Sequence, residues 1–135
     1  MLAAMDSTPS AIAVFDTVVL DCLDPHALAV FYQTLLGWQI VDDDADWVTI
    51  RDTSSTGTGK TGIAFQRADV FTAPTWPDPA VPQQAHIDFY VTDVEAAEKV
   101  ALHAGATATG KPGDNSHFRV YLDPAGHPFC LCWSS

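Results

Sequence analysis

A segment in the second half of the chain carries residues that could do acid–base chemistry. His86, Asp88 and Tyr90 alternate within the sequence HIDFYV, so in an extended strand their side chains share one face. An imidazole on such a polar face can act as a general base near neutral pH. The alternative is a histidine that only forms hydrogen bonds within a polar core, and the sequence leaves both open.

Two cysteines alternate in the same way near the C-terminus. Cys130 and Cys132 follow the turn DPAG in the segment FCLC. A cysteine becomes a nucleophile or a zinc ligand when a neighbouring base or cation favours its thiolate, and His86 is the candidate for that neighbour. The alternative is that both cysteines are unreactive and pack as small apolar residues in the core. The three cysteines of the chain cannot all pair, so we predict free thiols and a cytoplasmic location.

A wider set of polar and aromatic side chains is predicted to line a ligand cavity. Alternation places Arg119 and Tyr121 on one face of their strand, and we expect that face to join the face of His86. Such a cavity suits a small polar aromatic or carboxylate ligand, unless Asp88 and Arg119 simply pair across neighbouring strands. The ligand-binding residues that we predict are His86, Asp88, Tyr90, Arg119, Tyr121 and Trp47.

The elements that must position these residues occur twice in the same order. Asp24 and Asp93 are typical helix N-caps 69 residues apart, and Gly37 and Gly105 are typical C-caps. A strand–helix–strand–strand–strand order in each half indicates an internal repeat. The apolar and β-branched segments predict strands over residues 13–22, 38–41, 47–51, 63–66, 86–91, 106–109, 118–122 and 129–133.

The remaining segments connect or flank the two halves. Residues 67–84 hold a cluster of prolines, which excludes a helix and predicts an extended linker that Trp76 holds against the body. Residues 53–61 and 111–116 are predicted to be a loop and a turn, and the first lacks the glycine spacing of a phosphate-binding loop. The predicted organisation is a flexible tail over 1–12 and a single domain over 13–135, with modules over 13–66 and 85–135.

The charge of the chain excludes several classes of partner. Seventeen acidic residues oppose six basic ones, and the net charge is −11. Nucleic-acid binding relies on basic side chains, and anionic membrane surfaces repel a chain this acidic. No apolar run approaches the roughly 18 residues that a membrane span needs. We therefore expect neither nucleic acid nor a membrane as a partner.

Three motifs carry a resemblance to a known superfamily. They are DPHALAVFYQTLLGW over 24–38, HIDFYVTDVEAA over 86–97 and DPAGHPFCLC over 123–132. In their paired βαβββ setting they resemble the vicinal oxygen chelate superfamily of glyoxalases, bleomycin-resistance proteins and dioxygenases, in particular the glyoxalase-like proteins abundant in actinobacteria. The resemblance implies an α+β fold in which two tandem βαβββ modules form a cupped, mostly antiparallel sheet around a central cavity.

The same resemblance implies where a metal would be held. In that superfamily the ligands lie on the first and last strand of each module, and the corresponding residues here are Thr17, Gln66, His86 and Cys130. The candidate metal ligands are therefore His86, Gln66 and Cys130, and the thiol favours Zn²⁺ over Mg²⁺. Because this set is poorer than the family pattern of His, Gln and Glu, we expect no cofactor, with Zn²⁺, Ni²⁺ or Mn²⁺ as the alternative.

The expected function follows from this degenerate ligand set. We expect a metal-free small-molecule-binding protein of the bleomycin-resistance kind, with its ligand in the central cup. Apolar rims on the cup favour a homodimer. The alternative is a metal-dependent lyase or dioxygenase that uses His86 with Gln66 or Cys130, and a third option is a domain that binds another partner.

Overall fold

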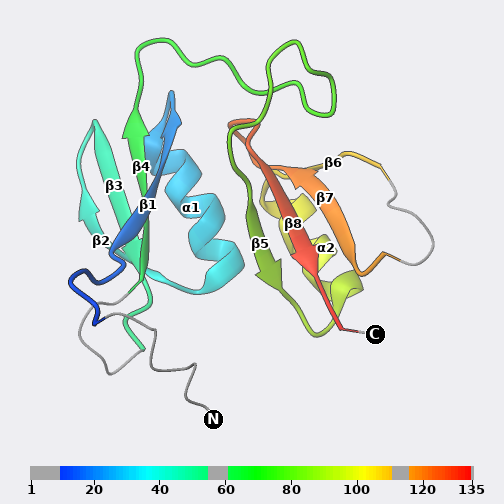
Figure 1. The fold of residues 1–135 in the computed structure, drawn as a ribbon, viewed down its shortest axis with the longest axis horizontal. Coiled ribbons are helices and arrows are strands. Elements are labelled where there is room, and N and C mark those ends of the chain that lie inside the picture. The colour runs from blue at the N-terminus through cyan, green and yellow to red at the C-terminus, as the bar shows by residue number, and fades with distance from the viewer. Residues whose placement is uncertain (1–9, 55–60, 111–115, 135) are drawn as a thin grey trace.

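Each half of the chain builds one sheet and one helix (Figure 1). The structure is a computed structural model that describes residues 10–54, 61–110 and 116–134. The first half, called the first module, contains β1 (Thr17–Cys22), α1 (Pro25–Leu36), β2 (Gln39–Asp43), β3 (Trp47–Arg51) and β4 (Gly62–Arg67). The second module contains β5 (Ile87–Tyr90), α2 (Val94–Ala104), β6 (Thr107–Ala108), β7 (Phe118–Leu122) and β8 (Pro128–Cys132).

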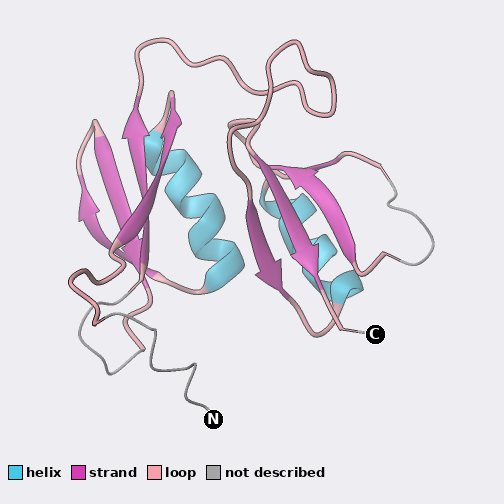
Figure 2. Ribbon diagram, viewed as in Figure 1, coloured by secondary structure: helices cyan, strands magenta, loops and turns pink. Residues whose placement is uncertain are grey.

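The two modules have the same sheet topology (Figure 2). The strand orders are β1-β4-β3-β2 and β5-β8-β7-β6. In each sheet the first and last strands of the module run parallel, and the other neighbours run antiparallel. This confirms the predicted α+β fold with two βαβββ modules whose strands are mostly antiparallel.

The helices begin and end where the sequence predicts. The carboxylates of Asp24 and Asp93 each accept a hydrogen bond at 3.1 Å from a backbone N–H three residues further on. Gly37 and Gly105 follow the helices with φ of 72° and 119°, a region in which other residues are strained. Neither helix in the described part of the chain is long and apolar enough to cross a membrane.

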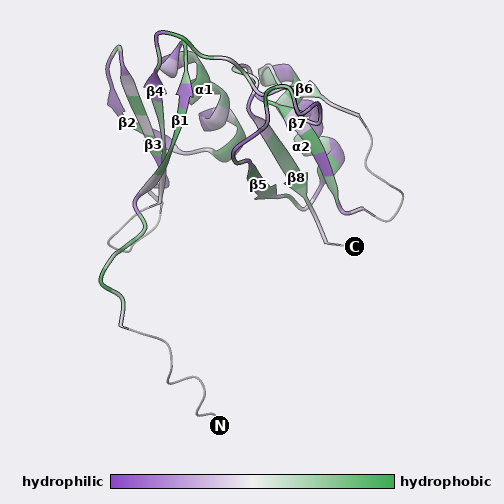
Figure 3. Ribbon diagram, turned by 45° about the horizontal axis from the view of Figure 1, so that its top comes forward, coloured by the Kyte–Doolittle hydropathy of each residue, from purple (hydrophilic) through white to green (hydrophobic). Residues whose placement is uncertain are grey.

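The first strand is shorter than the sequence predicts. β1 begins at Thr17 rather than at residue 13, because its partner Gly62 is also the first residue of β4. Residues 11–15 precede the strand as an apolar segment, drawn green in Figure 3, in which Ile12 is fully exposed. Most of the predicted tail, residues 1–9, lies outside the described residues.

The core lies where α1 packs between the two sheets. Tyr32 of α1 stacks on Phe65 of β4 with ring centroids 5.6 Å apart, and its ring centroid lies 6.0 Å from that of Phe89 in β5. Phe129 of β8 contacts rings from both modules. The Tyr32 hydroxyl donates at 2.6 Å to Oδ2 of Asp123, which gives this buried carboxylate a partner. Both sheets therefore bury the side that faces the helices.

The segment between the modules is a hydrogen-bonded loop that arches from β4 to β5 (Figure 1). The backbone N–H of Thr75 donates to the Val81 carbonyl at 2.7 Å, and Oγ1 of Thr75 accepts from the Val81 N–H at 2.9 Å. The linker has no helix or strand, as its prolines predict, but it is looped rather than extended. Most of the loop and the turn predicted over 53–61 and 111–116 lies outside the described residues.

Candidate functional site

A pocket of about 360 Å³ lies on the side of the second sheet that faces away from the helices. Its walls come from β5, β7, β8, the residues next to these strands, and the linker. The described residues that line it are Trp76, Gln83, His86, Asp88, His117, Phe118, Val120, Pro128, Cys130 and Cys132. None of these belongs to the first module, whereas we predicted a central cavity shared by both modules.

Strand register places three residues side by side at the middle of this face. Asp88 pairs with Cys130 of β8, and Cys130 pairs with Val120 of β7. Paired residues on neighbouring strands project to the same side of a sheet. His86 precedes Asp88 by two residues and also lines the pocket, as strand alternation predicts.

His86, Asp88 and Cys130 form a polar cluster in this pocket. Nε2 of His86 lies 3.1 Å from Oδ1 of Asp88, and one donor atom from each of the three residues lies within 4.8 Å of the others. Burial, together with a hydrogen bond to Asp88 and the charge of that carboxylate, raises the pKa of the Cys130 thiol to about 12. Burial also raises the pKa of Cys132. Both thiols are therefore protonated at neutral pH, which argues against a cysteine nucleophile.

The donor types of this cluster fit a zinc ion. Zn²⁺ binds imidazole nitrogen, thiolate sulfur and carboxylate oxygen, whereas Mg²⁺ and Ca²⁺ prefer oxygen alone. Zinc would have to displace the proton of Cys130, so its affinity would rise with pH. Three protein donors leave a fourth position for a small molecule, as in catalytic rather than structural zinc sites. Asp88 was predicted from the sequence as a ligand-binding residue but not as a metal ligand.

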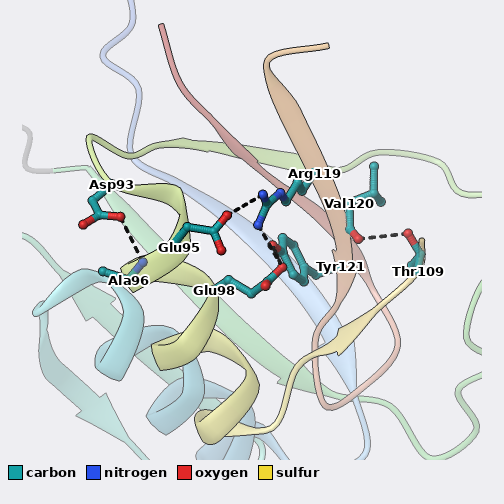
Figure 4. A network of polar contacts seen from close by, with 8 residues as sticks. All are labelled: Asp93, Glu95, Ala96, Glu98, Thr109, Arg119, Val120 and Tyr121. Atoms are coloured by element: carbon teal, nitrogen blue, oxygen red, sulfur yellow. Dashed lines mark hydrogen bonds and ion pairs between the residues drawn. The ribbon is translucent and has the colours of Figure 1, made fainter. Parts of the chain in front are cut away.

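Arg119 and Tyr121 point away from the pocket, toward α2 (Figure 4). Nη2 of Arg119 donates at 2.6 Å to Oε1 of Glu95, and the Tyr121 hydroxyl donates at 2.6 Å to Oε1 of Glu98. The alternate residues of β7, beginning with Phe118, line the pocket instead. The face that we predicted for Arg119 and Tyr121 is wrong, because here the polar side chains find their partners on the helix.

This network fixes both side chains on the helix side of the sheet. The hydrogen bond to Glu95 raises the pKa of the Arg119 guanidinium, while burial and then the hydrogen bond to Glu98 raise the pKa of Tyr121. The Arg119 guanidinium carbon also lies 5.7 Å from the centre of the Trp133 ring. The alternative pair of Arg119 with an aspartate across the sheet therefore does not form.

The predicted site residues of the first module lie on the other sheet. Trp47 pairs with Gln66, and Nε1 of Trp47 donates to Oγ1 of Thr49 at 2.7 Å. Thr17 pairs with Gly62 at the start of β4. The described residues that line the pocket with His86 do not include Thr17, Trp47 or Gln66.

Strand register also corrects the equivalence that suggested Gln66 as a metal ligand. Val19 and Asp88 each lie five residues before the N-cap of the following helix, so they are equivalent. Val19 pairs with Ala64, whereas Asp88 pairs with Cys130. The first-module residue equivalent to Cys130 is therefore Ala64, and Gln66 lies two residues further along β4.

Several lining residues were not predicted as site residues. Trp76 and Gln83 come from the linker, and a tryptophan among prolines was the only signal that this segment folds onto the sheet. Local sequence patterns do not show where such a loop lands. Tyr90, which was predicted, follows Asp88 on the same side of β5 but is 67% exposed and lies beyond the described lining residues.

Solved structures share this fold at low sequence identity. A glyoxalase/bleomycin resistance protein/dioxygenase family enzyme from Burkholderia phytofirmans has a TM-score of 0.66 at 20% identity, covering 90% of this chain and 98% of that one. The fosfomycin resistance protein FosX from Listeria monocytogenes has a TM-score of 0.64 at 14% identity, covering 95% and 96%. The bleomycin-binding protein of Streptomyces verticillus, solved with copper(II)-bleomycin, has a TM-score of 0.56 at 18% identity, covering 93% and 100%.

A family-level match spans both modules. The sequence pattern of the glyoxalase-like domain matches residues 17–132, from the first residue of β1 to the last residue of β8. A search of curated proteins finds no match to the chain. Because the family match includes both helices and both sheets, the chain belongs to the glyoxalase-like domain family.

Proposed function

We propose that this protein binds a small organic molecule in the pocket of the second module. The observation that carries the proposal is the pocket itself, which encloses about 360 Å³ between apolar walls and one polar cluster. Small-molecule sites typically measure roughly 300–1,000 Å³ and combine apolar surface with a few polar groups. Two proteins of the same fold, one that binds bleomycin and one that gives fosfomycin resistance, support a small-molecule role.

The proposed contacts divide into apolar and polar ones. Trp76 and Phe118 provide aromatic surface, while His86 and Asp88 provide hydrogen-bonding groups. Tyr90 and Trp47 lie outside the pocket lining, so we propose them only for a ligand that extends beyond it. Arg119 and Tyr121 are no longer proposed as ligand contacts, because their polar ends are engaged by α2.

The binding proposal is tested by a thermal-shift screen of small aromatic and cationic compounds. A ligand that binds only the folded protein raises its melting temperature. The Trp76→Ala variant should lose about tenfold or more in affinity for each hit, since large aromatic contacts dominate binding energy. Val70→Ala is the matched control, because Val70 is a linker residue that is 86% exposed and outside the pocket. Equal affinities in the two variants would overturn the proposed binding site.

A homodimer in the cytoplasm is part of the same proposal. Phe118 and Val19 are about 40% exposed on the sides of the sheets that face away from the helices, and a second copy would cover such apolar surface. Sedimentation equilibrium at micromolar protein concentration tests the dimer, and a monomer would refute it. The free thiols of Cys22, Cys130 and Cys132 support a reducing compartment.

The second candidate function is a metal-dependent lyase or dioxygenase. The observation that favours it is the donor cluster of His86, Asp88 and Cys130, in which Asp88 takes the place predicted for Gln66. A bound Zn²⁺, Ni²⁺ or Mn²⁺ would act as a Lewis acid toward an oxygen of the substrate. Trp76 and Phe118 would hold the substrate over the cluster and keep water out.

Elemental analysis of freshly purified protein tests the metal. About one Zn²⁺, Ni²⁺ or Mn²⁺ per chain, lost in His86→Ala and retained in His103→Ala, would favour the enzyme. His103 is an exposed residue of α2 outside the cluster and serves as the matched control. Protein that binds ligands from the screen and takes up no metal from a micromolar solution would refute this second candidate.

A further inference from the structure

One wall of the pocket contains a hydrogen-bond acceptor that has no donor. Gln83 lines the pocket, and its Oε1 atom is buried without a hydrogen-bond partner among the described residues. An unsatisfied buried acceptor destabilises the folded state, and most such groups in folded proteins have a partner. The Oε1 atom has almost no accessible surface, so the Gln83 side chain must rotate into the pocket before a ligand with an N–H or O–H group can supply the missing donor.

A second acceptor in the pocket is negatively charged. Asp88 has an Oδ1 atom 3.1 Å from Nε2 of His86 and lies beside the thiol of Cys130. A carboxylate has about four acceptor positions, so these neighbours leave capacity for a further donor. The Asp88 side chain is 59% exposed, which leaves it accessible to a ligand in the pocket.

The pocket has no lysine or arginine among its described lining residues. The nearest candidate from the sequence, Arg119, is on the other side of the sheet and is paired with Glu95 and Glu98. The whole chain carries a net charge of −11, so its field attracts cations and repels anions. A carboxylate ligand, which the sequence suggested, would meet Asp88 without an arginine or lysine to offset it.

The aromatic walls fit the same type of ligand. Trp76 and Phe118 both line the pocket, and the faces of such rings attract ammonium groups as well as apolar surface. The volume of about 360 Å³ accommodates a fused two-ring compound with a short side chain.

We propose that the ligand class of this pocket is an aromatic primary amine bound as its ammonium ion. The ammonium group donates to the exposed Asp88 carboxylate, Gln83 rotates to offer Oε1 as a second acceptor, and the ring system lies between Trp76 and Phe118. This inference rests on the proposed small-molecule-binding function and narrows it to one chemistry.

The test compares three compounds that share a ring and differ in charge. They are 2-(1-naphthyl)ethylamine, 2-(1-naphthyl)ethanol and 1-naphthylacetate, measured by isothermal titration calorimetry at pH 7 with EDTA present, so that a metal cannot contribute. The amine should bind about tenfold or more tightly than the alcohol, because a hydrogen bond between two charged groups is stronger than one from a neutral hydroxyl. The acetate should bind more weakly than the alcohol.

Variants separate a local contact from the overall charge of the chain. Asp88→Asn should reduce the preference for the amine over the alcohol by about tenfold or more while leaving alcohol binding in place. Gln83→Leu should weaken both compounds, because a hydroxyl can also donate to Oε1. Asp42→Asn removes the same charge from an exposed position of β2, outside the pocket, and should leave the preference unchanged. The melting temperature of each variant, measured without ligand, shows that it is folded.

The outcomes distinguish this inference from the proposed function. If the three compounds bind equally well and Trp76→Ala weakens them all, the pocket binds small molecules but the amine inference is wrong. If none of the three binds while other compounds from the screen do, the amine inference is again wrong. If Asp42→Asn lowers the preference as much as Asp88→Asn, the effect belongs to the net charge, and the assigned contact is refuted. If no compound of the screen binds, the proposed function itself fails.

Discussion

The two modules share a fold but differ on the sheet faces that point away from the helices. In the second module the central row across β5, β8 and β7 consists of Asp88, Cys130 and Val120. The equivalent row across β1, β4 and β3 of the first module consists of Val19, Ala64 and Thr49. One row offers a carboxylate and a thiol beside a histidine, whereas the other has only a hydroxyl, which is already bonded to Trp47.

On the first module, Arg51 covers part of the equivalent sheet face. Arg51 lies across Gly62, where an added Cβ would be 2.9 Å from the Arg51 guanidinium, and Nη2 of Arg51 pairs with Asp16 at 2.7 Å. In the second module Trp76 and Gln83 of the linker line the pocket together with residues of the sheet. The repeat therefore retains helix caps and core packing in both copies, whereas the donor cluster of His86, Asp88 and Cys130 has no counterpart in the central row of the first module.

The largest expected effect concerns the packing that joins the modules. Among the described residues, Phe129 lies within 5.5–6.2 Å of four other aromatic rings, whereas Phe65 has one such neighbour, Tyr32. Truncation of a buried phenylalanine to alanine costs about 3–5 kcal/mol. We expect Phe129→Ala near the upper end and Phe65→Ala near the lower end, measured by urea unfolding. A larger cost for Phe65→Ala would contradict the view that the second sheet anchors both modules.

The next effect sharpens the contrast between the two central rows. If zinc binds the cluster, Cys130→Ser should reduce its affinity by more than the about 10–100-fold typical of second-shell changes, because a direct ligand is lost. Cys132→Ser is the matched control, since Cys132 lines the same pocket but is outside the cluster. Competition with a chromogenic chelator measures both affinities. Equal losses of zinc affinity in the two variants would show that Cys130 is not a direct zinc ligand.

A smaller effect tests the hydrogen bond between the two modules. Tyr32 of the first module donates to Asp123 of the second, and burial, followed by the charge of Asp123, raises the Tyr32 pKa well above its ordinary value of 10.0. The folded state thus retains a proton that the unfolded chain loses above pH 10. The stabilisation that comes from this raised Tyr32 pKa is complete below pH 10 and falls as the pH rises further. Tyr32→Phe should cost about 1.5–3 kcal/mol at pH 7.

The pH dependence distinguishes this bond from simple packing. Urea unfolding between pH 9 and 11 should show a steeper loss of stability in the wild type than in Tyr32→Phe. Tyr121, whose pKa is raised by burial and by its bond to Glu98, contributes a loss of the same sign in both proteins. Parallel pH profiles would mean that the Tyr32 hydroxyl does not link the modules energetically.

Much of the fold could be predicted from sequence because its signals are local. The caps Asp24 and Asp93, and the glycine that follows each helix, determine where the helices begin and end. Each of these residues lies next to the helix end that it determines, so the signal can be read from the local sequence. Strand ends were less well predicted, since β1 begins only at Thr17, where its pairing with Gly62 of β4 begins. The linker was placed only in outline, because the position of Trp76 depends on contacts with strands that are distant in sequence.

The candidate site shows the limit of strand alternation. Alternation correctly grouped His86 with Asp88 on one face of β5, and Arg119 with Tyr121 on one face of β7. It does not say whether these two faces lie on the same side of the sheet. Register decides this, and it pairs Cys130 with Val120 rather than with either polar residue of β7. Polarity alone suggested the wrong face, because the carboxylates that satisfy these residues lie on α2.

The smallest expected effect tests this corrected face directly. Arg119 and Glu98 are partly exposed, and pairs of this kind contribute about 0–1 kcal/mol, so Arg119→Met should lower stability only slightly. Because Arg119 lies on the helix side of the second sheet, the same variant should leave the affinity for every pocket ligand within about twofold. Asp88→Asn provides the contrast, with little change in stability and a large change in amine binding. If Arg119→Met weakened ligand binding as strongly as Asp88→Asn, the ligand would lie on the helix side, and the difference between the two modules would have to be sought there.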